Sequence, residues 1–183
     1  AGVGLDNVDI PAATAAGVMV VNAPTSNIVS AAELAIALLL ASARHVSPAH
    51  AALKNGKWAR SKYTGAELFE KTLGVVGFGR IGQSLASYAL GVGMNVIAID
   101  NKKQDVSIEV KVGNQLVSIP MSTETDLHAQ LGHMDYISIH VPKQADGSAV
   151  LGAKEFGQMK KGVFIANAAR GGVLDEAALF DAI

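Results

Sequence analysis

Residues 73–82 read Leu73-Gly-Val-Val-Gly77-Phe-Gly79-Arg-Ile-Gly82, and this stretch decides the fold. The short apolar run predicts a buried strand over Leu73–Val76. The apolar spacing that follows predicts a helix over Ile81–Leu90, ended by Gly91. Between them the glycines are spaced G-x-G-x-x-G. A strand, a glycine turn and a helix in this order are typical of a βαβ unit that binds a dinucleotide.

Each glycine has a separate role in this prediction. Gly77 allows the tight turn, Gly79 lets the backbone approach a pyrophosphate, and Gly82 lets the helix pack closely on the strand. The free amides at the start of the helix, assisted by the helix dipole, then hold the phosphates. A glycine-rich turn in a non-binding α/β fold is the alternative. It does not explain why an acidic residue also stands at the expected distance.

That acidic residue is Asp100, which ends the next predicted strand, Met94–Ile99, 23 residues after Gly77. A carboxylate there accepts hydrogen bonds from the adenosine ribose hydroxyls and repels a 2′-phosphate, which favours NAD over NADP. Lys102 and Lys103 act against this preference, because an ammonium group could reach a phosphate. The predicted cofactor is NAD.

Short apolar runs alternate with helical segments along the rest of the chain. Further strands are predicted over 18–21, 116–119, 136–141 and 162–166, and further helices over 11–16, 30–44, 48–55, 122–131, 154–159 and from 175 onward. A capping box at Ser30–Glu33 and a cap at Ser122 mark two helix starts. The polar stretch 101–114 is predicted to be the least structured. The alternation predicts an α/β fold, a Rossmann-type doubly wound parallel sheet covered on both faces.

Composition excludes several classes of protein. The 183 residues hold 15 Lys and Arg against 16 Asp and Glu, a balance that argues against nucleic-acid and anionic-membrane binding. The absence of cysteine excludes disulfides and thiolate metal sites and fits a cytoplasmic protein. The longest apolar run, Leu34–Ala43, is too short to span a membrane, and Ala1–Ile10 lacks the basic start of a secretory signal.

Four motifs carry a resemblance to a known family. They are Ala1-Gly-Val-Gly-Leu-Asp-Asn-Val-Asp9, Asn22-Ala-Pro24 with Ser30-Ala-Ala-Glu33, Gly77–Gly82, and Asn167-Ala-Ala-Arg-Gly-Gly-Val-Leu-Asp-Glu176. In this order they resemble the D-isomer-specific 2-hydroxyacid dehydrogenases over essentially the whole chain. The likeness is greatest to the members that act on D-3-phosphoglycerate, including the wording Asn55-Gly-Lys-Trp58.

The resemblance implies NAD-dependent oxidation of a small 2-hydroxy acid, D-3-phosphoglycerate, to 3-phosphohydroxypyruvate at the start of serine synthesis. This chain would be an incomplete, mainly cofactor-binding fragment of that enzyme. A glyoxylate, hydroxypyruvate or lactate dehydrogenase is the alternative within the family. An NAD-sensing corepressor with the same fold is the alternative from another class.

The resemblance also implies two domains with the active site in the cleft between them. Residues 1–25 correspond to the carboxyl end of a flavodoxin-like substrate domain. Residues 26–183 correspond to the NAD domain, which includes a crossing helix and is truncated at its end. The family further implies a homodimer or a homotetramer.

Site roles follow from the same resemblance. Arg170 is the catalytic residue, and its guanidinium can fork across the carboxylate and the adjacent oxygen of a 2-hydroxy acid. Arg80 and Ile81 contact the pyrophosphate, while Val3 and Gly4 belong to a loop whose amides meet substrate and, at Val3, the nicotinamide. Val141, Ala168, Ala169 and Arg170 line the cofactor at the strand ends.

The proton acceptor of the family is a His held by a Glu, and both are expected beyond Ile183. None of the five histidines of the chain is assigned this role; His140, at the end of a strand, is expected near the cofactor. No pair of histidines has the spacing and carboxylate company of a zinc site, so no metal is expected.

A basic cluster surrounds the only tryptophan, Trp58, and consists of Lys57, Arg60 and Lys62. It could bind a phosphorylated substrate or a neighbouring subunit, although an exposed loop with ordinary charges is the simpler interpretation. The Ala-rich helices over 31–43 and 49–53 favour close packing in the core, with a dimer interface as the family-based alternative.

Overall fold

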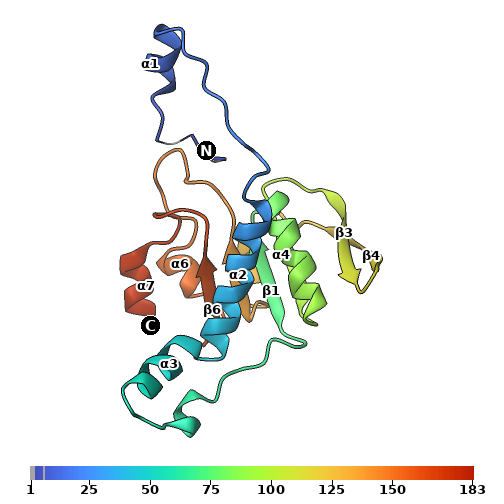
Figure 1. Ribbon diagram of the computed structural model, residues 1–183, viewed down its shortest axis with the longest axis vertical. Coiled ribbons are helices and arrows are strands. Elements are labelled where there is room, and N and C mark those ends of the chain that lie inside the picture. The colour runs from blue at the N-terminus through green and yellow to red at the C-terminus, as the bar shows by residue number, and fades with distance from the viewer. Residues whose placement is uncertain (1–2, 6) are drawn as a thin grey trace.

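The computed structural model describes residues 3–5 and 7–183, and it confirms the predicted parallel sheet (Figure 1). Ala1, Gly2 and Asp6 of the opening motif lie outside the described residues. Four parallel strands pair in the order β2-β1-β5-β6. They are β1 (Thr72–Val76), β2 (Asn95–Ile99), β5 (Tyr136–Ile139) and β6 (Phe164–Asn167).

Helices cover both faces of this sheet. On one face α2 (Ile28–Ala43) and α4 (Arg80–Gly91) pack against each other and against the strands. The other face is covered by α5 (Leu127–Leu131) and α6 (Ala153–Phe156), with α7 (Glu176–Ala182) beside α6. The side chains of β1 and β5 alternate between two apolar clusters: Leu73, Val75 and Tyr136 belong to the first, and Val76, Ile137 and Ile139 to the second. This double burial explains why the strands are continuous apolar runs.

The amino-terminal segment has a different character. Its helix α1 (Ile10–Ala15) buries no residue, and Figure 1 shows it projecting from the body of the molecule with the chain on either side. Asp9 caps α1 by accepting a hydrogen bond from the amide of Ala12 at 2.9 Å. After α2 the chain continues through α3 (Val46–Lys54) and a 3-10 turn, η1 (Arg60–Tyr63), before it enters β1.

The strand predicted over 18–21 is wrong. These residues form neither a helix nor a strand, and Val18, Met19 and Val21 are exposed, Met19 at 86%. A strand needs a neighbour for its backbone hydrogen bonds, and none of the described strands pairs with this segment. The apolar residues therefore remain on the surface of the described structure.

The capping box predicted at Ser30–Glu33 is also wrong. The helix α2 begins two residues earlier, at Ile28, after the Asn27 cap. Ser30 therefore lies within the first turn, where its hydroxyl donates to the carbonyl of Asn27 at 3.2 Å instead of accepting from an amide.

The polar stretch 101–114, predicted to be the least structured, contributes instead to a β-hairpin. Antiparallel strands β3 (Asp105–Val112) and β4 (Gln115–Ser122) are joined by Gly113-Asn114, with Gly113 at a φ of +62°. The strands form a separate two-stranded sheet, and β3 packs on α4. Strict alternation explains this: Ile108 and Val110 are buried, whereas the intervening side chains are polar and exposed.

The helix predicted over 122–131 is shorter than expected. Ser122 belongs to β4, where its hydroxyl contacts Asp105 at the base of the hairpin. The helix α5 begins at Leu127, because Asp126 supplies the cap and accepts from the amide of Ala129 at 3.1 Å.

Among the described residues, no single helix has the length and apolarity of a membrane span. Taken together, α2 and α3 are long and apolar enough, but the two helices meet at an angle of 63°.

Candidate functional site

The glycine turn after β1 is built around a close backbone approach. Gly77 has a φ of +94°, and its amide donates to the carbonyl of Ile99 at 2.9 Å. A Cβ at this position would lie 2.7 Å from the carbonyl carbon and oxygen of His140. No side chain fits there, so only glycine lets the chain turn between the ends of β2 and β5.

The other two glycines serve different purposes, as the sequence predicts. A Cβ at Gly82 would lie 2.3 Å from the carbonyl oxygen of Gly77, so this glycine permits the close packing of α4 on the turn. A Cβ at Gly79 would meet nothing within 4 Å. The space in front of Gly79 is therefore open, and a ligand can approach the backbone there.

The first turn of α4 faces that open space. Gly79 is the N-cap residue, and no side chain caps the helix. The first amides of a helix have no acceptor within it and carry the positive end of its dipole. A diphosphate is an anion that such a turn can bind.

Asp100 is fixed against the glycine turn. Its Oδ2 accepts a hydrogen bond from the amide of Phe78 at 2.9 Å, and its own amide donates to the carbonyl of Glu124 at 3.1 Å. Within the described part of the chain, Oδ1 of Asp100 has no hydrogen-bond partner. This leaves one carboxylate oxygen that ribose hydroxyls could reach; the role of Asp100 in binding ribose stays a prediction.

A hollow of about 230 Å³ lies beside the glycine turn. Its wall combines five predicted site residues, Val3, Gly79, Arg80, Ile81 and Gly82, with His140, which the sequence analysis expects near the cofactor. Three further residues that line the hollow were not predicted: Pro24, Asn27 and Ile28. Arg80 reaches across it, and its Nη1 donates to the carbonyl of Pro24 at 3.4 Å. The segment before α2 therefore closes one side of the hollow. No sequence pattern indicated this, because Pro24 and Arg80 are far apart in the chain.

His140 closes another side of the hollow. Its Nε2 lies 2.9 Å from the hydroxyl of Ser138, a fully buried residue, and its amide donates to the carbonyl of Val76 at 2.7 Å. Burial lowers the pKa of His140 to about 4. The imidazole is therefore uncharged at neutral pH and adds no positive charge beside α4.

Arg170 stands in a loop that follows β6 at the same edge of the sheet. Asn167 organises this loop: its Oδ1 accepts from the amide of Ala169 at 3.0 Å, and its Nδ2 donates to the carbonyl of Arg170 at 2.9 Å. The Arg170 side chain is exposed, and its Nη1 donates to the carbonyl of Ala169 at 2.9 Å. The sequence did not predict this role of Asn167, although its side chain type is typical of such local backbone bonds.

The remaining predicted residues lie around this edge without joining the hollow. Val141 follows β5 and lies next to Gly77, where an added Cβ would come 2.8 Å from its Cγ1. Ala168 is half-buried and packs on the first apolar cluster. Gly4 is exposed; its neighbour Val3, which does line the hollow, accepts a hydrogen bond from Nδ2 of Asn22 at 3.0 Å.

These residues fit an NAD molecule. The open space at Gly79, the uncapped amides of α4 and the carboxylate of Asp100 follow one another along the sheet edge, as pyrophosphate and ribose do in the cofactor. Gly79 to Gly82 would hold the pyrophosphate, and Asp100 the adenosine ribose. Among residues 3–5 and 7–183, no three His, Asp or Glu side chains form a group that could hold a metal ion.

Comparison with known proteins identifies the family. Residues 36–183 match the family described as D-isomer specific 2-hydroxyacid dehydrogenase, NAD binding domain. The whole chain is 49% identical to D-3-phosphoglycerate dehydrogenase of Mycobacterium tuberculosis, of which it covers 33%. It is 48% identical to the chloroplastic D-3-phosphoglycerate dehydrogenase 3 of Arabidopsis thaliana, of which it covers 30%. The chain thus spans about a third of the length of these relatives.

Solved structures give the same result. The pyruvate reductase of Chlamydomonas reinhardtii superposes with a TM-score of 0.79 at 35% identity, over 99% of this chain and 51% of that protein. The NAD-dependent formate dehydrogenase of Staphylococcus aureus, solved in complex with NAD, superposes with a TM-score of 0.79 at 30% identity, over 99% and 52%.

The chain therefore belongs to the D-isomer-specific 2-hydroxyacid dehydrogenases, which are NAD-dependent oxidoreductases acting on CH–OH groups. It carries the NAD-binding domain of that family on a Rossmann-type fold.

The glycines provide a test that separates binding from folding. We expect Gly79→Ala to lower NADH affinity about tenfold or more, because the new methyl group occupies the space needed by a phosphate, with little change in Tm. Gly82→Ala should instead lower Tm, because its methyl group meets the Gly77 carbonyl. Calorimetric titration and thermal unfolding measure the two effects. Unchanged NADH affinity in Gly79→Ala would show that the pyrophosphate does not bind at this turn.

The buried His140 predicts a pH dependence of stability. Its folded-state pKa of about 4 lies below the unfolded value of 6.5, so the unfolded chain binds a proton that the folded chain does not. The free energy of unfolding should be highest above pH 6.5 and fall by up to about 3 kcal/mol as pH decreases towards 4. Urea unfolding across this interval measures the slope.

The matched variants are His140→Gln and His133→Gln. The first should lose most of the slope between pH 6.5 and 4, whereas the second, at an exposed position, should keep it. If the free energy of unfolding of His140→Gln keeps the full pH dependence, other titrating groups cause that dependence.

Proposed function

We propose that the whole protein oxidises D-3-phosphoglycerate to 3-phosphohydroxypyruvate with NAD, and that residues 1–183 contribute the cofactor site and Arg170. The supporting observation is the 49% identity to D-3-phosphoglycerate dehydrogenase, which extends over the entire chain. The solved relatives, named for other 2-hydroxy acid or formate reactions, are less similar, at 28 to 35% identity for the D-lactate, formate, glyoxylate and pyruvate enzymes.

Arg170 binds and orients the substrate in this proposal. It stands at the carboxyl end of β6, the edge where parallel sheets bind their ligands. A guanidinium can donate to the substrate carboxylate and to the oxygen on C2 at once, which fixes C2 and polarises the C2 oxygen. Asn167 holds the Arg170 backbone in place through the loop bonds described above.

The chemistry divides between the protein and its cofactor. Bound NAD supplies the acceptor for the hydride that leaves C2. The hydroxyl proton of the substrate must pass to a base, and His140 is poorly suited because burial lowers its pKa to about 4. We assign the base to the His–Glu pair that the family resemblance locates beyond Ile183.

We also propose that residues 1–25 belong to a substrate domain and residues 26–183 to the NAD domain. The exposed side chains of Val18, Met19 and Val21 support this division, because they form an apolar surface that another part of the protein would cover. Val3 and Gly4 would then belong to the cleft between the domains, beside the hollow at the glycine turn.

Substrate turnover tests the proposed reaction. The whole protein should reduce NAD with D-3-phosphoglycerate at a kcat/KM at least about tenfold above those for D-lactate and D-glycerate. Arg170→Lys should lower kcat/KM about 100-fold or more, because an ammonium group cannot replace the bidentate fork. NADH affinity should fall far less than kcat/KM, because Arg170 is only one of several residues expected to line the cofactor. A preference for another 2-hydroxy acid would select the alternative within the family, and NADH binding without turnover would select the sensor.

We propose in addition that the protein forms a homodimer through α2, α3 and Trp58. Large apolar side chains are exposed here, including Leu34, Leu53 and Trp58, the last at 81%. A hollow of about 390 Å³ lies between α3 and the 3-10 turn and is lined by Leu53, Trp58 and Tyr63 among others. A second copy of this chain would cover these surfaces, in keeping with the oligomers that the family resemblance implies.

Sedimentation equilibrium tests this interface. Trp58→Arg should shift the protein from dimer to monomer, because a charge replaces the exposed indole within the apolar surface. Phe180→Arg changes an equally exposed aromatic residue on α7 and should leave the dimer intact. A dimer that survives Trp58→Arg, or a wild-type monomer, would contradict the proposal.

A further inference from the structure

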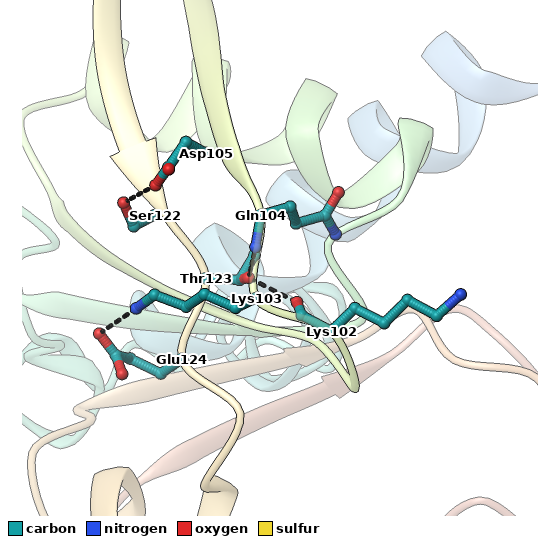
Figure 2. A network of polar contacts seen from close by, with 7 residues as sticks. All are labelled: Lys102, Lys103, Gln104, Asp105, Ser122, Thr123 and Glu124. Carbon is teal, nitrogen blue, oxygen red and sulfur yellow. Dashed lines mark hydrogen bonds and ion pairs between the residues drawn. The ribbon is translucent and has the colours of Figure 1, made fainter.

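The loop that follows Asp100 is held by a buried hydroxyl at the base of the β3–β4 hairpin, just after β4. Thr123 is fully buried, and its Oγ1 donates to the carbonyl of Lys102 at 2.7 Å while accepting from the amide of Gln104 at 2.9 Å. The Thr123 amide donates to the carbonyl of Gln104 at 3.0 Å. Figure 2 shows the hydrogen bond by which Thr123, after β4, is joined to Lys102, before β3.

The next residue, Glu124, fixes Asp100 itself. Its amide donates to the carbonyl of Ala98 at 2.8 Å, and its carbonyl accepts from the amide of Asp100 at 3.1 Å. Residues Ile99 and Glu124 thus form a parallel bridge beside the end of β2. Asp100 is held from two sides, by the glycine turn through Phe78 and by Glu124.

The charges on this loop are arranged by the same residues. Nζ of Lys103 lies 3.5 Å from Oε1 of Glu124, and Figure 2 shows the Lys102 side chain extending in the opposite direction. An NADP molecule would bring a 2′-phosphate towards Asp100, and the phosphate needs a cation in place of the ribose-binding carboxylate. Lys103 is three residues from Asp100, but its ammonium group is paired with the carboxylate of Glu124.

We propose that Thr123 and Glu124 are positioning residues that make this site select NAD over NADP. Thr123 holds the loop from Asp100 to Gln104 in one form, and Glu124 keeps Lys103 paired and unavailable to a 2′-phosphate. The inference rests on the assignment of Asp100 to the ribose. Selectivity is then set by the hairpin as well as by the Asp100 carboxylate.

The direct test is Glu124→Gln in the whole protein, with NADH and NADPH affinities measured by calorimetric titration. NADPH should bind about three- to tenfold more tightly than in wild type, a modest change because the Lys103–Glu124 pair is exposed, while NADH affinity stays within about twofold. Adding Lys103→Ala should cancel the gain. Glu124 is a surface residue, so this test does not depend on the stability of the hairpin.

Thr123→Val tests the loop, because valine keeps the shape and removes the hydroxyl. The ratio of NADPH to NADH dissociation constants should fall at least about threefold. Thr123→Ser should restore the ratio, and Ser122→Ala, which removes only the contact with Asp105 at the hairpin base, should leave it unchanged.

Three results would overturn the inference. Equal changes in NADH and NADPH affinity in the two variants would show that Thr123 and Glu124 stabilise the fold without affecting selectivity. Unchanged NADPH affinity in Glu124→Gln would show that Lys103 is not restrained by this pair. If the wild-type protein binds NADH and neither variant changes the ratio of NADPH to NADH dissociation constants, the NAD site stands and only the inference fails. If the wild-type protein binds neither dinucleotide, the assignment of the NAD site fails together with the inference.

Discussion

The contact between Gly77 and the carbonyl of His140 leaves no room for a side chain, and the rest of the site is arranged around it. Because the glycine turn passes so close to the end of β5, α4 starts directly above the sheet edge and directs its first amides outward. The same turn lets the Phe78 amide reach Asp100 from the end of β2. A single steric constraint therefore brings together the ends of β1, β2 and β5, where the cofactor would bind.

The electrostatics of this edge follow from burial and from helix geometry. The uncapped start of α4 supplies positive potential for a diphosphate, and the neutral imidazole of His140 neither adds to it nor titrates near neutral pH. Asp100 places a carboxylate at the end of β2, where it would accept hydrogen bonds from ribose hydroxyls. Arg170 stands apart from the hollow, in a loop of its own at the same edge of the sheet. In the proposed reaction it would meet the substrate there, next to the bound cofactor.

Sequence patterns predicted most of the parallel sheet, because strands buried on both faces must be continuous apolar runs. The same reasoning predicted the 116–119 part of β4 but missed its partner β3 in the hairpin. Its exposed face carries charged residues such as Glu109 and Lys111, so overall polarity concealed the alternation that packs Ile108 on α4. It also failed at residues 18–21, where an apolar run predicted burial but the described structure offers no neighbouring strand.

The sequence by itself determined the βαβ unit, its three glycines, the acid at position 100 and the family, because local sterics and spacing are written in consecutive residues. Tertiary structure alone decided how Pro24, Asn27 and His140 close the hollow and how Asn167 shapes the Arg170 loop. It also decided how Glu124 holds Asp100 and how Thr123 holds the loop that follows Asp100. Except in the Asn167 loop, these contacts join residues far apart in the chain. Their hydrogen bonds and burial exist only once the sheet, α4 and the hairpin have packed together.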